Sequence, residues 1–238
     1  MFLRNDIFNT SHIPKIHIHK KGGLMIKTII FDFWGTLVEN GTYSPVRQVR
    51  NILNLRDMLF SEYIIKLERA MMLRKFADLK EAFENVCKEF AISPPPYKLN
   101  TLIGMWNKNW LLAKPYPETI QLLGELKKNY KLVLISNTDN FSVEPVLKKF
   151  DLEKYFDLIL LSYKTGILKT DKQMFEQALK NFGIKPEEVI MVGDSIESDI
   201  KPAEEFGIKA VLVDRRNRRQ DFPNRILKLD EIKSFLNQ

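Results

Sequence analysis

Apolar runs and amphipathic stretches alternate along most of the chain. Five short runs, rich in β-branched side chains and bounded by turn residues, predict strands at 26–32, 131–136, 158–161, 189–193 and 210–213. Between them, apolar residues that recur every three or four positions predict helices at Pro117–Asn129, Phe141–Lys149, Lys172–Phe182 and Ser198–Phe206. Strands that alternate with such helices are typical of an α/β fold with a doubly wound parallel sheet, which we therefore expect.

Residues 42–112 interrupt this alternation. The segment has helical patterns and no strand pattern, and the helices are expected at Pro45–Leu53, Leu55–Phe76, Asp78–Phe90 and Tyr97–Leu112. A proline-rich break at 93–96 divides them into two groups. About seventy residues of helix are too many for an ordinary crossover between two strands. We therefore expect an all-helical insertion at 42–112 within a core domain formed by 25–41 and 113–238.

Residues 1–24 stand apart from the rest of the chain. They hold all three histidines, His12, His17 and His19, and they lack the apolar segment of a signal peptide. Because Met25 directly precedes the first predicted strand, we expect a flexible N-terminal extension at 1–24. The remaining chain contains no histidine, which argues against serine–histidine hydrolysis and against histidine-bound zinc.

Composition is ordinary for a soluble globular protein, with 45% hydrophobic and 28% charged residues. No apolar run approaches the roughly 20 residues that a membrane-spanning helix needs, so we expect no membrane partner. The single cysteine, Cys87, excludes an internal disulfide and suits the reducing cytoplasm, where we expect the protein. We interpret Cys87 as a core residue of a helix, and we expect a monomer or a dimer.

A net charge of +7 raises the question of a polyanionic partner. The densest basic cluster, at 214–219, follows the last predicted strand and is therefore expected in a loop. No aromatic residue lies among its arginines, whereas single-stranded nucleic acid is usually bound by stacking on aromatic rings. We interpret 214–219 as a solvated loop and expect no nucleic-acid partner.

Two of the predicted strands end in an aspartate. Asp32 follows the first apolar strand, Asp194 follows the strand at 189–193, and Asp199 comes shortly afterwards. Open parallel sheets bind ligands at the carboxyl ends of their strands, so we expect these side chains to meet at one edge. Carboxylates in such a place suit a hard cation beside a nucleophilic carboxylate.

Four motifs, in this order, resemble those of the haloacid dehalogenase superfamily of hydrolases. In that family they are a strand followed by Asp-x-Asp-Gly-Thr, a strand ending in Ser or Thr, a lysine before a helix, and Gly-Asp with a further aspartate. The corresponding stretches here are 32–36 (DFWGT), Ser136-Asn137, Lys169, and Gly193-Asp194 with Asp199. Any one motif is a weak signal, but the set covers roughly residues 25–215. The resemblance implies a Rossmann-like core and a helical cap, inserted after the first motif at 42–112.

The resemblance also implies which residues react with the substrate. Asp32 would attack an electrophilic centre and form a covalent aspartyl intermediate, which water then hydrolyses. Ser136 and Lys169 would be catalytic, because they would stabilise charge on the transferred group. Ser136, Asn137 and Lys169 would together bind the substrate.

A magnesium site is implied in the same way. Mg²⁺ would be held by Asp32, by Asp194 and by the backbone carbonyl group of Trp34. Thr36 and Asp199 would support the site, the latter by holding the metal or by orienting the catalytic lysine.

Trp34 departs from the family pattern. It stands where family phosphatases carry a second aspartate, which protonates the leaving group and later activates water. An indole donates a hydrogen bond but does not titrate, and general acid–base catalysis is worth about 10² to 10⁴ in rate. Asp139, just beyond the second motif, is a candidate replacement.

The family's dehalogenases also place an aromatic residue at the position of Trp34, so carbon–halogen cleavage is one alternative. They use an arginine at the cap entrance, for which Arg47 and Arg50 are available. However, they need no metal and lack the Gly-Asp of the fourth motif, which this chain keeps as Gly193-Asp194. We therefore expect a Mg²⁺-dependent phosphohydrolase that acts on a small phosphorylated metabolite. A dehalogenase and a catalytically weak binding protein on the same fold are the alternatives.

Overall fold

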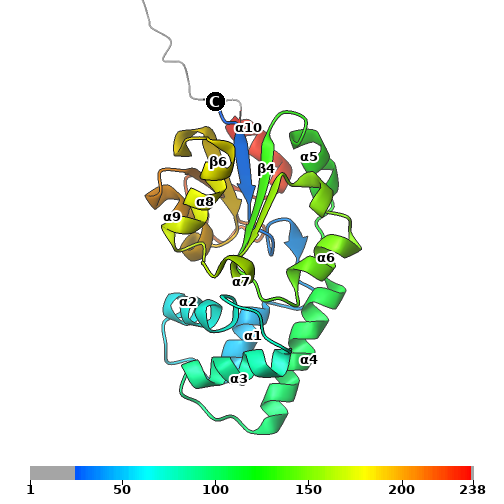
Figure 1. Cartoon of the computed structure of the whole chain (residues 1–238), viewed down its shortest axis with the longest axis vertical. Coiled ribbons are helices and arrows are strands. Elements are labelled where there is room, and N and C mark those ends of the chain that lie inside the picture. Colours follow the sequence, from blue (N-terminus) through cyan, green and yellow to red (C-terminus); the bar gives the residue numbers. More distant parts are fainter. Residues whose placement is uncertain (1–24, 237–238) are drawn as a thin grey trace, which may run out of the picture.

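The computed structural model describes residues 25–236, so the extension predicted at 1–24 lies outside the described residues. A six-stranded sheet with the order β5-β4-β1-β6-β7-β8 forms the centre of the molecule (Figure 1). Its strands are β1 (Thr28–Phe31), β4 (Lys131–Ser136), β5 (Leu158–Leu161), β6 (Val189–Gly193), β7 (Lys209–Val213) and β8 (Arg225–Ile226). All neighbouring strands are parallel, which confirms the predicted doubly wound sheet.

Helices cover both faces of the sheet, and alternate residues of each strand pack against them. The α-helices of this core are α5 (Thr119–Leu126), α6 (Val143–Lys149), α7 (Ser162–Thr165), α8 (Lys172–Phe182), α9 (Lys201–Glu205) and α10 (Lys233–Leu236). Ile29 and Phe31 pack in one hydrophobic cluster with α5 and α6, whereas Ile30 packs in another with α8 and α9. Burial on both faces explains why the strands read as almost unbroken apolar runs.

Several elements of the core differ from the sequence prediction. The helix predicted at Ser198–Phe206 is instead the π-helix η3 (Ile196–Ile200) followed by α9, whose first turn holds Pro202. Within residues 25–236, eight short elements of two to four residues were not predicted, because each offers little periodicity. They are the strands β2 (Val38–Glu39), β3 (Lys114–Pro115) and β8, the helices α7 and α10, and the 3₁₀ helices η1 (Glu153–Tyr155), η2 (Pro186–Glu188) and η4 (Leu229–Ile232).

Four helices between β2 and β3 form what we call the helical unit. They are α1 (Pro45–Ile52), α2 (Phe60–Met71), α3 (Leu79–Glu89) and α4 (Pro96–Leu112). The antiparallel pairing of β2 with β3 brings the chain's entry to this unit beside its exit. Helix α2 is shorter at both ends than the predicted Leu55–Phe76. It begins later because Arg50 donates hydrogen bonds to the carbonyl oxygens of Leu55 and Arg56, which hold that segment in a loop.

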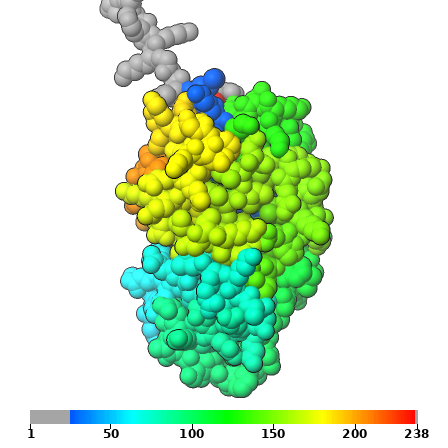
Figure 2. Space-filling view, in the orientation of Figure 1, coloured from blue at the N-terminus to red at the C-terminus, as the bar shows by residue number. Residues whose placement is uncertain are grey.

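The helical unit has its own hydrophobic cluster, separate from the two clusters of the sheet. Tyr63, Leu67, Phe83 and Leu102 lie at its centre and are inaccessible to solvent. Cys87 is also buried there, as predicted for a core residue. In Figure 1 the unit lies at the end of the sheet where α7 is found, and in Figure 2 its atoms meet those of the core along the visible face.

None of the helices between residues 25 and 236 has the length and apolar character needed to cross a membrane.

Truncating a leucine at the centre of the helical unit should destabilise the protein. Leu67 is fully buried, so Leu67→Ala should lower the free energy of unfolding by about 2–5 kcal/mol through lost contacts and a cavity. Leu59→Ala is the matched control, because Leu59 is 67% exposed and should tolerate the change. Urea unfolding followed by circular dichroism measures both; equal effects would contradict a packed core in this unit.

Candidate active site

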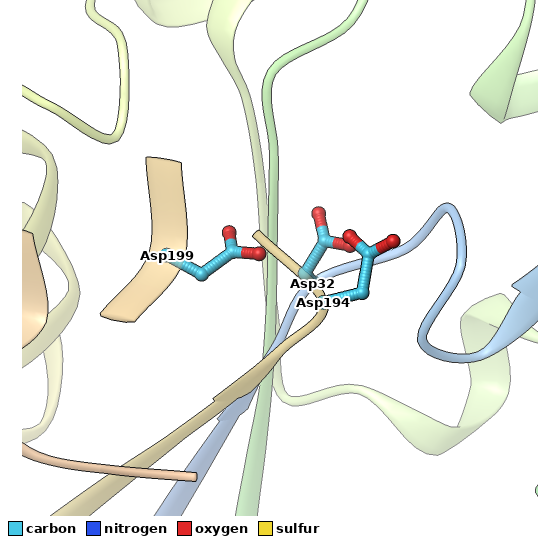
Figure 3. Close-up of side chains that lie close together, drawn as sticks. All are labelled: Asp32, Asp194 and Asp199. Carbon is cyan, nitrogen blue, oxygen red and sulfur yellow. The ribbon is translucent and has the colours of Figure 1, made fainter. Parts of the chain in front are cut away.

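Three carboxylates meet at the carboxyl end of the sheet, two at the ends of neighbouring strands and one on a short helix. Asp32 directly follows β1, Asp194 directly follows β6, and Asp199 lies in η3. One oxygen from each carboxyl group lies within 4.8 Å of the others, and Figure 3 shows Asp199 pointing toward the other two. The parallel pairing of Phe31 with Val192 sets this arrangement, because it aligns the two strand ends.

Lys169 places a single buried ammonium group among these carboxylates. Its Nζ lies 2.6 Å from Oδ1 of Asp32 and also forms an ion pair with Asp199. The residue is only 3% exposed. Burial lowers the pKa of Lys169, but the charges of Asp199 and Asp32 outweigh burial and raise it above its ordinary value. Lys169 therefore stays a cation at neutral pH.

The cluster contains more carboxylates than positively charged groups. The cluster holds three carboxylates and one ammonium group, which pairs with Asp32 and Asp199, so full ionisation leaves an excess of two negative charges. Burial raises the pKa of Asp32 to about 6 despite the nearby Lys169. Desolvation in the site, with the charges of Asp32 and Asp199, also raises the pKa of Asp194 well above its ordinary value, although this residue keeps a solvent-exposed surface. Crowded carboxylate oxygens of this kind match the ligands that Mg²⁺ prefers.

Two glycines allow the carboxylates to approach the backbone. Gly35 has a positive φ of 76°, and a Cβ atom at this position would collide with Oδ2 of Asp194. A Cβ atom on Gly193 would collide with the carboxyl group of Asp199. Glycine is therefore required at position 35, beside Asp194, and at position 193, beside Asp199, for steric reasons.

The remaining motif residues lie beside Asp32 or at the end of the neighbouring strand β4. Thr36 Oγ1 donates to Oδ2 of Asp32 over 3.2 Å. Asn137 follows β4 and accepts from the backbone N–H of Lys169 over 2.9 Å, which ties the lysine's loop to the sheet. Ser136 ends β4, and its buried Oγ atom has no hydrogen-bond partner among the residues that the structure describes. An unpaired buried hydroxyl group is costly, so Ser136 suits a polar ligand.

The side chain of Trp34 belongs to the apolar surroundings of this site. It is half-buried, packs against the sheet's hydrophobic cluster, and meets the ring of Phe33 edge-to-face at 5.0 Å between centroids. The indole group of Trp34 thus has a packing role within the first motif and offers no titratable group.

Asp139 does not reach the carboxylate cluster as a free acid. It is 1% exposed, and both of its carboxyl oxygens are already hydrogen-bonded. Oδ2 accepts from Trp106 Nε1 over 2.9 Å, while Oδ1 accepts from the N–H of Phe141 over 2.7 Å; Ser142 donates to both oxygens. The role considered for Asp139 as a replacement acid is therefore wrong, since its carboxyl group joins α4 to the start of α6.

Arg215 has a structural role that was not predicted from the sequence, where it was placed in a solvated loop. The guanidinium group of Arg215 is half-buried and donates to the carbonyl oxygens of Gly35, over 3.2 Å, and of Thr36, over 2.7 Å. It also pairs with Glu118 at 2.8 Å. Arg215 thereby holds the loop that follows Asp32. The neighbouring Arg216, Arg218 and Arg219 are exposed, as predicted.

Glu68 is the second residue that the sequence did not reveal. It comes from α2 of the helical unit, yet its carboxyl group is buried against the core. Asn137 Nδ2 donates to it over 2.9 Å and Ser198 Oγ over 3.4 Å. A glutamate in an amphipathic helix gives no local signal of such a contact, because the partners lie far away in the sequence.

The two arginines considered for halide binding have other contacts. Arg50 stabilises the loop before α2, where it donates hydrogen bonds to the carbonyl oxygens of Leu55, Arg56 and Met58. Arg47 lies over the ring of Phe60, with 4.1 Å from its guanidinium carbon to the ring centroid.

Residues 26–207 match the family model of the haloacid dehalogenase-like hydrolases. The chain therefore belongs to this family and is a hydrolase, as the four motifs predicted. Its sheet with helices on both faces is the Rossmann-like core of that family.

Known relatives carry different activities on this fold. The chain is 29% identical over 194 residues to glyceraldehyde 3-phosphate phosphatase of Methanothermobacter thermautotrophicus, covering 79% of this chain and 86% of that protein. Among solved structures, YfnB of Bacillus subtilis, a hydrolase of the superfamily bound to magnesium, has a TM-score of 0.62 at 19% identity, covering 90% of this chain and 100% of the other. A 2-haloacid dehalogenase of Pseudomonas syringae has a TM-score of 0.60 at 20% identity, covering 90% and 99%.

Adding one methyl group at Gly35 should disrupt the site. Gly35→Ala combines an unfavourable positive φ with a collision at Asp194, so the free energy of unfolding should fall by roughly 1–3 kcal/mol. Gly104→Ala in α4 is the matched control: no atom lies near its Cβ position, and it should stabilise the helix by roughly 0.5–1 kcal/mol. Chemical denaturation of both variants makes the comparison, and a neutral Gly35→Ala would contradict the close approach of Asp194.

Proposed function

We propose that the protein is a Mg²⁺-dependent phosphatase that hydrolyses a small phosphorylated metabolite through an aspartyl phosphate on Asp32. The observation that carries this proposal is the pairing of Asp32 with the Lys169 ammonium group inside an acidic cluster, next to the strand β4, which ends in the unpaired hydroxyl group of Ser136. The similarity to an archaeal glyceraldehyde 3-phosphate phosphatase over most of both chains supports the same class of substrate.

Each side chain has a distinct part in the proposed reaction. Asp32 attacks the phosphorus atom, the leaving group departs, and water then hydrolyses the aspartyl phosphate. Ser136 donates a hydrogen bond to a phosphoryl oxygen, while Lys169 balances negative charge on Asp32 and on the transferred group. Asn137 holds the Lys169 loop and contributes to the substrate site. Thr36 orients the second oxygen of Asp32.

The acidic cluster is proposed to hold Mg²⁺ through Asp32, Asp194 and the Trp34 carbonyl group. When bound, the ion supplies positive charge that allows an anionic nucleophile to approach an anionic phosphoryl group. Asp199 is proposed to position Lys169, with which it forms an ion pair.

We also propose a division of the chain into two domains. Residues 25–41 and 113–238 form the catalytic core, and residues 42–112 form a cap that covers the site. Separate hydrophobic clusters and the pairing of β2 with β3 at the junction support this division. We place the protein in the cytoplasm, as a monomer or a dimer without a nucleic-acid or membrane partner.

Trp34 is the feature that favours carbon–halogen cleavage as a second candidate function. Turnover of an aryl phosphate and of 2-chloropropionate, each with Mg²⁺ and with EDTA, separates the two activities. The proposal requires Mg²⁺-dependent hydrolysis of the phosphate; metal-independent release of chloride alone would replace it with the dehalogenase.

Asp32→Asn should abolish turnover while the fold is kept, because the two side chains are nearly isosteric and only the carboxylate is a nucleophile. The matched control is Asp221→Asn, a change at an exposed aspartate outside the site, which should be silent. Steady-state hydrolysis of p-nitrophenyl phosphate and thermal denaturation measure activity and folding. An Asp32→Asn enzyme with wild-type turnover would end the proposed mechanism.

Asp194→Asn should weaken Mg²⁺ binding, because it removes one negative oxygen ligand from the cluster. A ligand that binds the folded state raises the melting temperature by mass action. We therefore expect Mg²⁺ to raise the Tm of the wild type clearly and that of Asp194→Asn much less, and EDTA to abolish turnover. An equal Tm response in both proteins would exclude Asp194 as a ligand.

A further inference from the structure

One buried carboxyl group beside the proposed reaction centre has no part in the mechanism above. Glu68 is 8% exposed although it is held by α2 of the helical unit, outside the core that carries all four motifs. Its Oε2 atom accepts from Asn137 Nδ2 over 2.9 Å, and its Oε1 atom accepts from Ser198 Oγ over 3.4 Å. Helix α2 thus places a carboxyl group in hydrogen-bond contact with Asn137, the residue that follows Ser136.

Glu68 forms no ion pair among residues 25–236. The charged groups that act on it most are Lys169, Asp199 and Asp32, but the Lys169 ammonium group is already shared by the two aspartates. Burial raises the pKa of Glu68 to about 7, although Lys169 acts in the opposite direction. A carboxyl group of this kind can carry a proton near neutral pH and can also give it up.

Packing alone does not account for an acid at this position. The other buried side chains of α2 are Tyr63, Leu67, Ala70 and Met71, which fill the apolar core of the helical unit. Burying a carboxyl group without a cation costs free energy that an apolar side chain would not cost. Such a cost is typical of functional groups.

The direction of attack places Glu68 on the side of the leaving group. In a phosphoryl transfer the attacking and leaving oxygens lie roughly in line on opposite sides of phosphorus. Asp32 attacks from the end of β1, so the leaving oxygen faces away from the sheet, toward the helices that cover its carboxyl end. Glu68 is the buried carboxyl group that α2 presents there, and Figure 1 shows α2 opposite α7 at this end of the sheet.

We propose that Glu68 is the general acid and base of the reaction and performs the role that Trp34 cannot perform. This inference rests on the proposed function. In the first step an oxygen of Asp32 bonds to phosphorus, the bond from phosphorus to the leaving oxygen breaks, and that oxygen takes its electron pair and the proton of Glu68. In the second step water attacks the phosphorus and gives a proton to the Glu68 carboxylate. The bond to Asp32 breaks, and inorganic phosphate leaves.

The other candidates for this proton are excluded by their contacts. The Trp34 indole does not titrate. Each carboxyl oxygen of Asp139 accepts hydrogen bonds from two of the donors that join α4 to α6, whereas each carboxyl oxygen of Glu68 accepts from one donor. Asn137 and Ser198 cannot act as acids near neutral pH, but they orient the carboxyl group of Glu68. The acid therefore comes from the helical unit and is held in place by two residues of the core.

The test compares a poor and a good leaving group in Glu68→Gln. Glutamine can keep both hydrogen bonds, since its oxygen can accept from Asn137 and its amide can donate to Ser198, but it carries no acidic proton. The kcat/KM for β-glycerophosphate should fall by about 10² or more, in line with the usual worth of a general acid, whereas that for p-nitrophenyl phosphate should fall less than tenfold. Glu62→Gln, an exposed change in the same helix, should leave both values unchanged.

Each outcome decides between a chemical and a structural role. An equal fall in kcat/KM for both substrates would show that Glu68 only holds the helical unit against the core. An unchanged kcat/KM for both would show that Glu68 has no part in the reaction. Either result overturns the inference. If Glu68→Gln does not fold, the wild type alone gives the answer through a series of aryl phosphates. With a proton donor in place, kcat/KM should depend only weakly on the pKa of the leaving phenol, and a steep dependence would contradict the role of Glu68.

Failure of the proposed function looks different from these results. In that case the wild type would hydrolyse neither phosphate in the presence of Mg²⁺, and the inference would fall with the function on which it rests. Turnover of both phosphates by the wild type, with an unchanged substrate ratio in Glu68→Gln, would leave the phosphatase standing and remove only Glu68 from its mechanism.

Discussion

The ammonium group of Lys169, buried between Asp32 and Asp199, is the interaction on which the proposed active site depends. It offsets part of the repulsion among the three carboxylates that meet at the carboxyl end of the sheet. The compensation is incomplete, since one cation faces three potential anions. The remaining negative charge is what makes the site suitable for a divalent metal ion. The same crowding explains why glycine stands at positions 35 and 193, because a Cβ atom at either position would collide with a carboxyl group.

Two layers of structure surround this charge cluster and have different tasks. The sheet sets the positions of Asp32 and Asp194 through the register of β1 and β6, and Arg215 secures the loop after Asp32 from outside. The helical unit adds Glu68, whose carboxyl group meets the core only when α2 lies against it. In the proposed mechanism the core thus supplies the nucleophile and the phosphoryl site, and the helical unit supplies the acid.

How much of this could be predicted from the sequence depends on how local each signal is. The strands and the residues at their ends are recognisable within a few consecutive positions, so the amino-acid sequence alone is enough to single out Asp32. Lys169 lies in a loop and was singled out through the resemblance to the family's motifs. The contacts of Glu68 and Arg215 join segments 69 and 180 residues apart, and neither residue differs locally from a surface charge. Asp139 was misjudged for the related reason that its hydrogen-bond partner Trp106 comes from the helical unit.

The central claim is a covalent phosphoryl group on Asp32, and chemical trapping tests it most directly. The enzyme would be mixed with p-nitrophenyl phosphate and Mg²⁺, quenched during turnover and reduced with borohydride, which converts an aspartyl phosphate to homoserine. Mass spectrometry of the peptide around position 32 then reads the product. The account predicts substrate-dependent reduction at Asp32 and at no other carboxyl group. Turnover of the substrate without any such modification, or modification at a different aspartate, would contradict it.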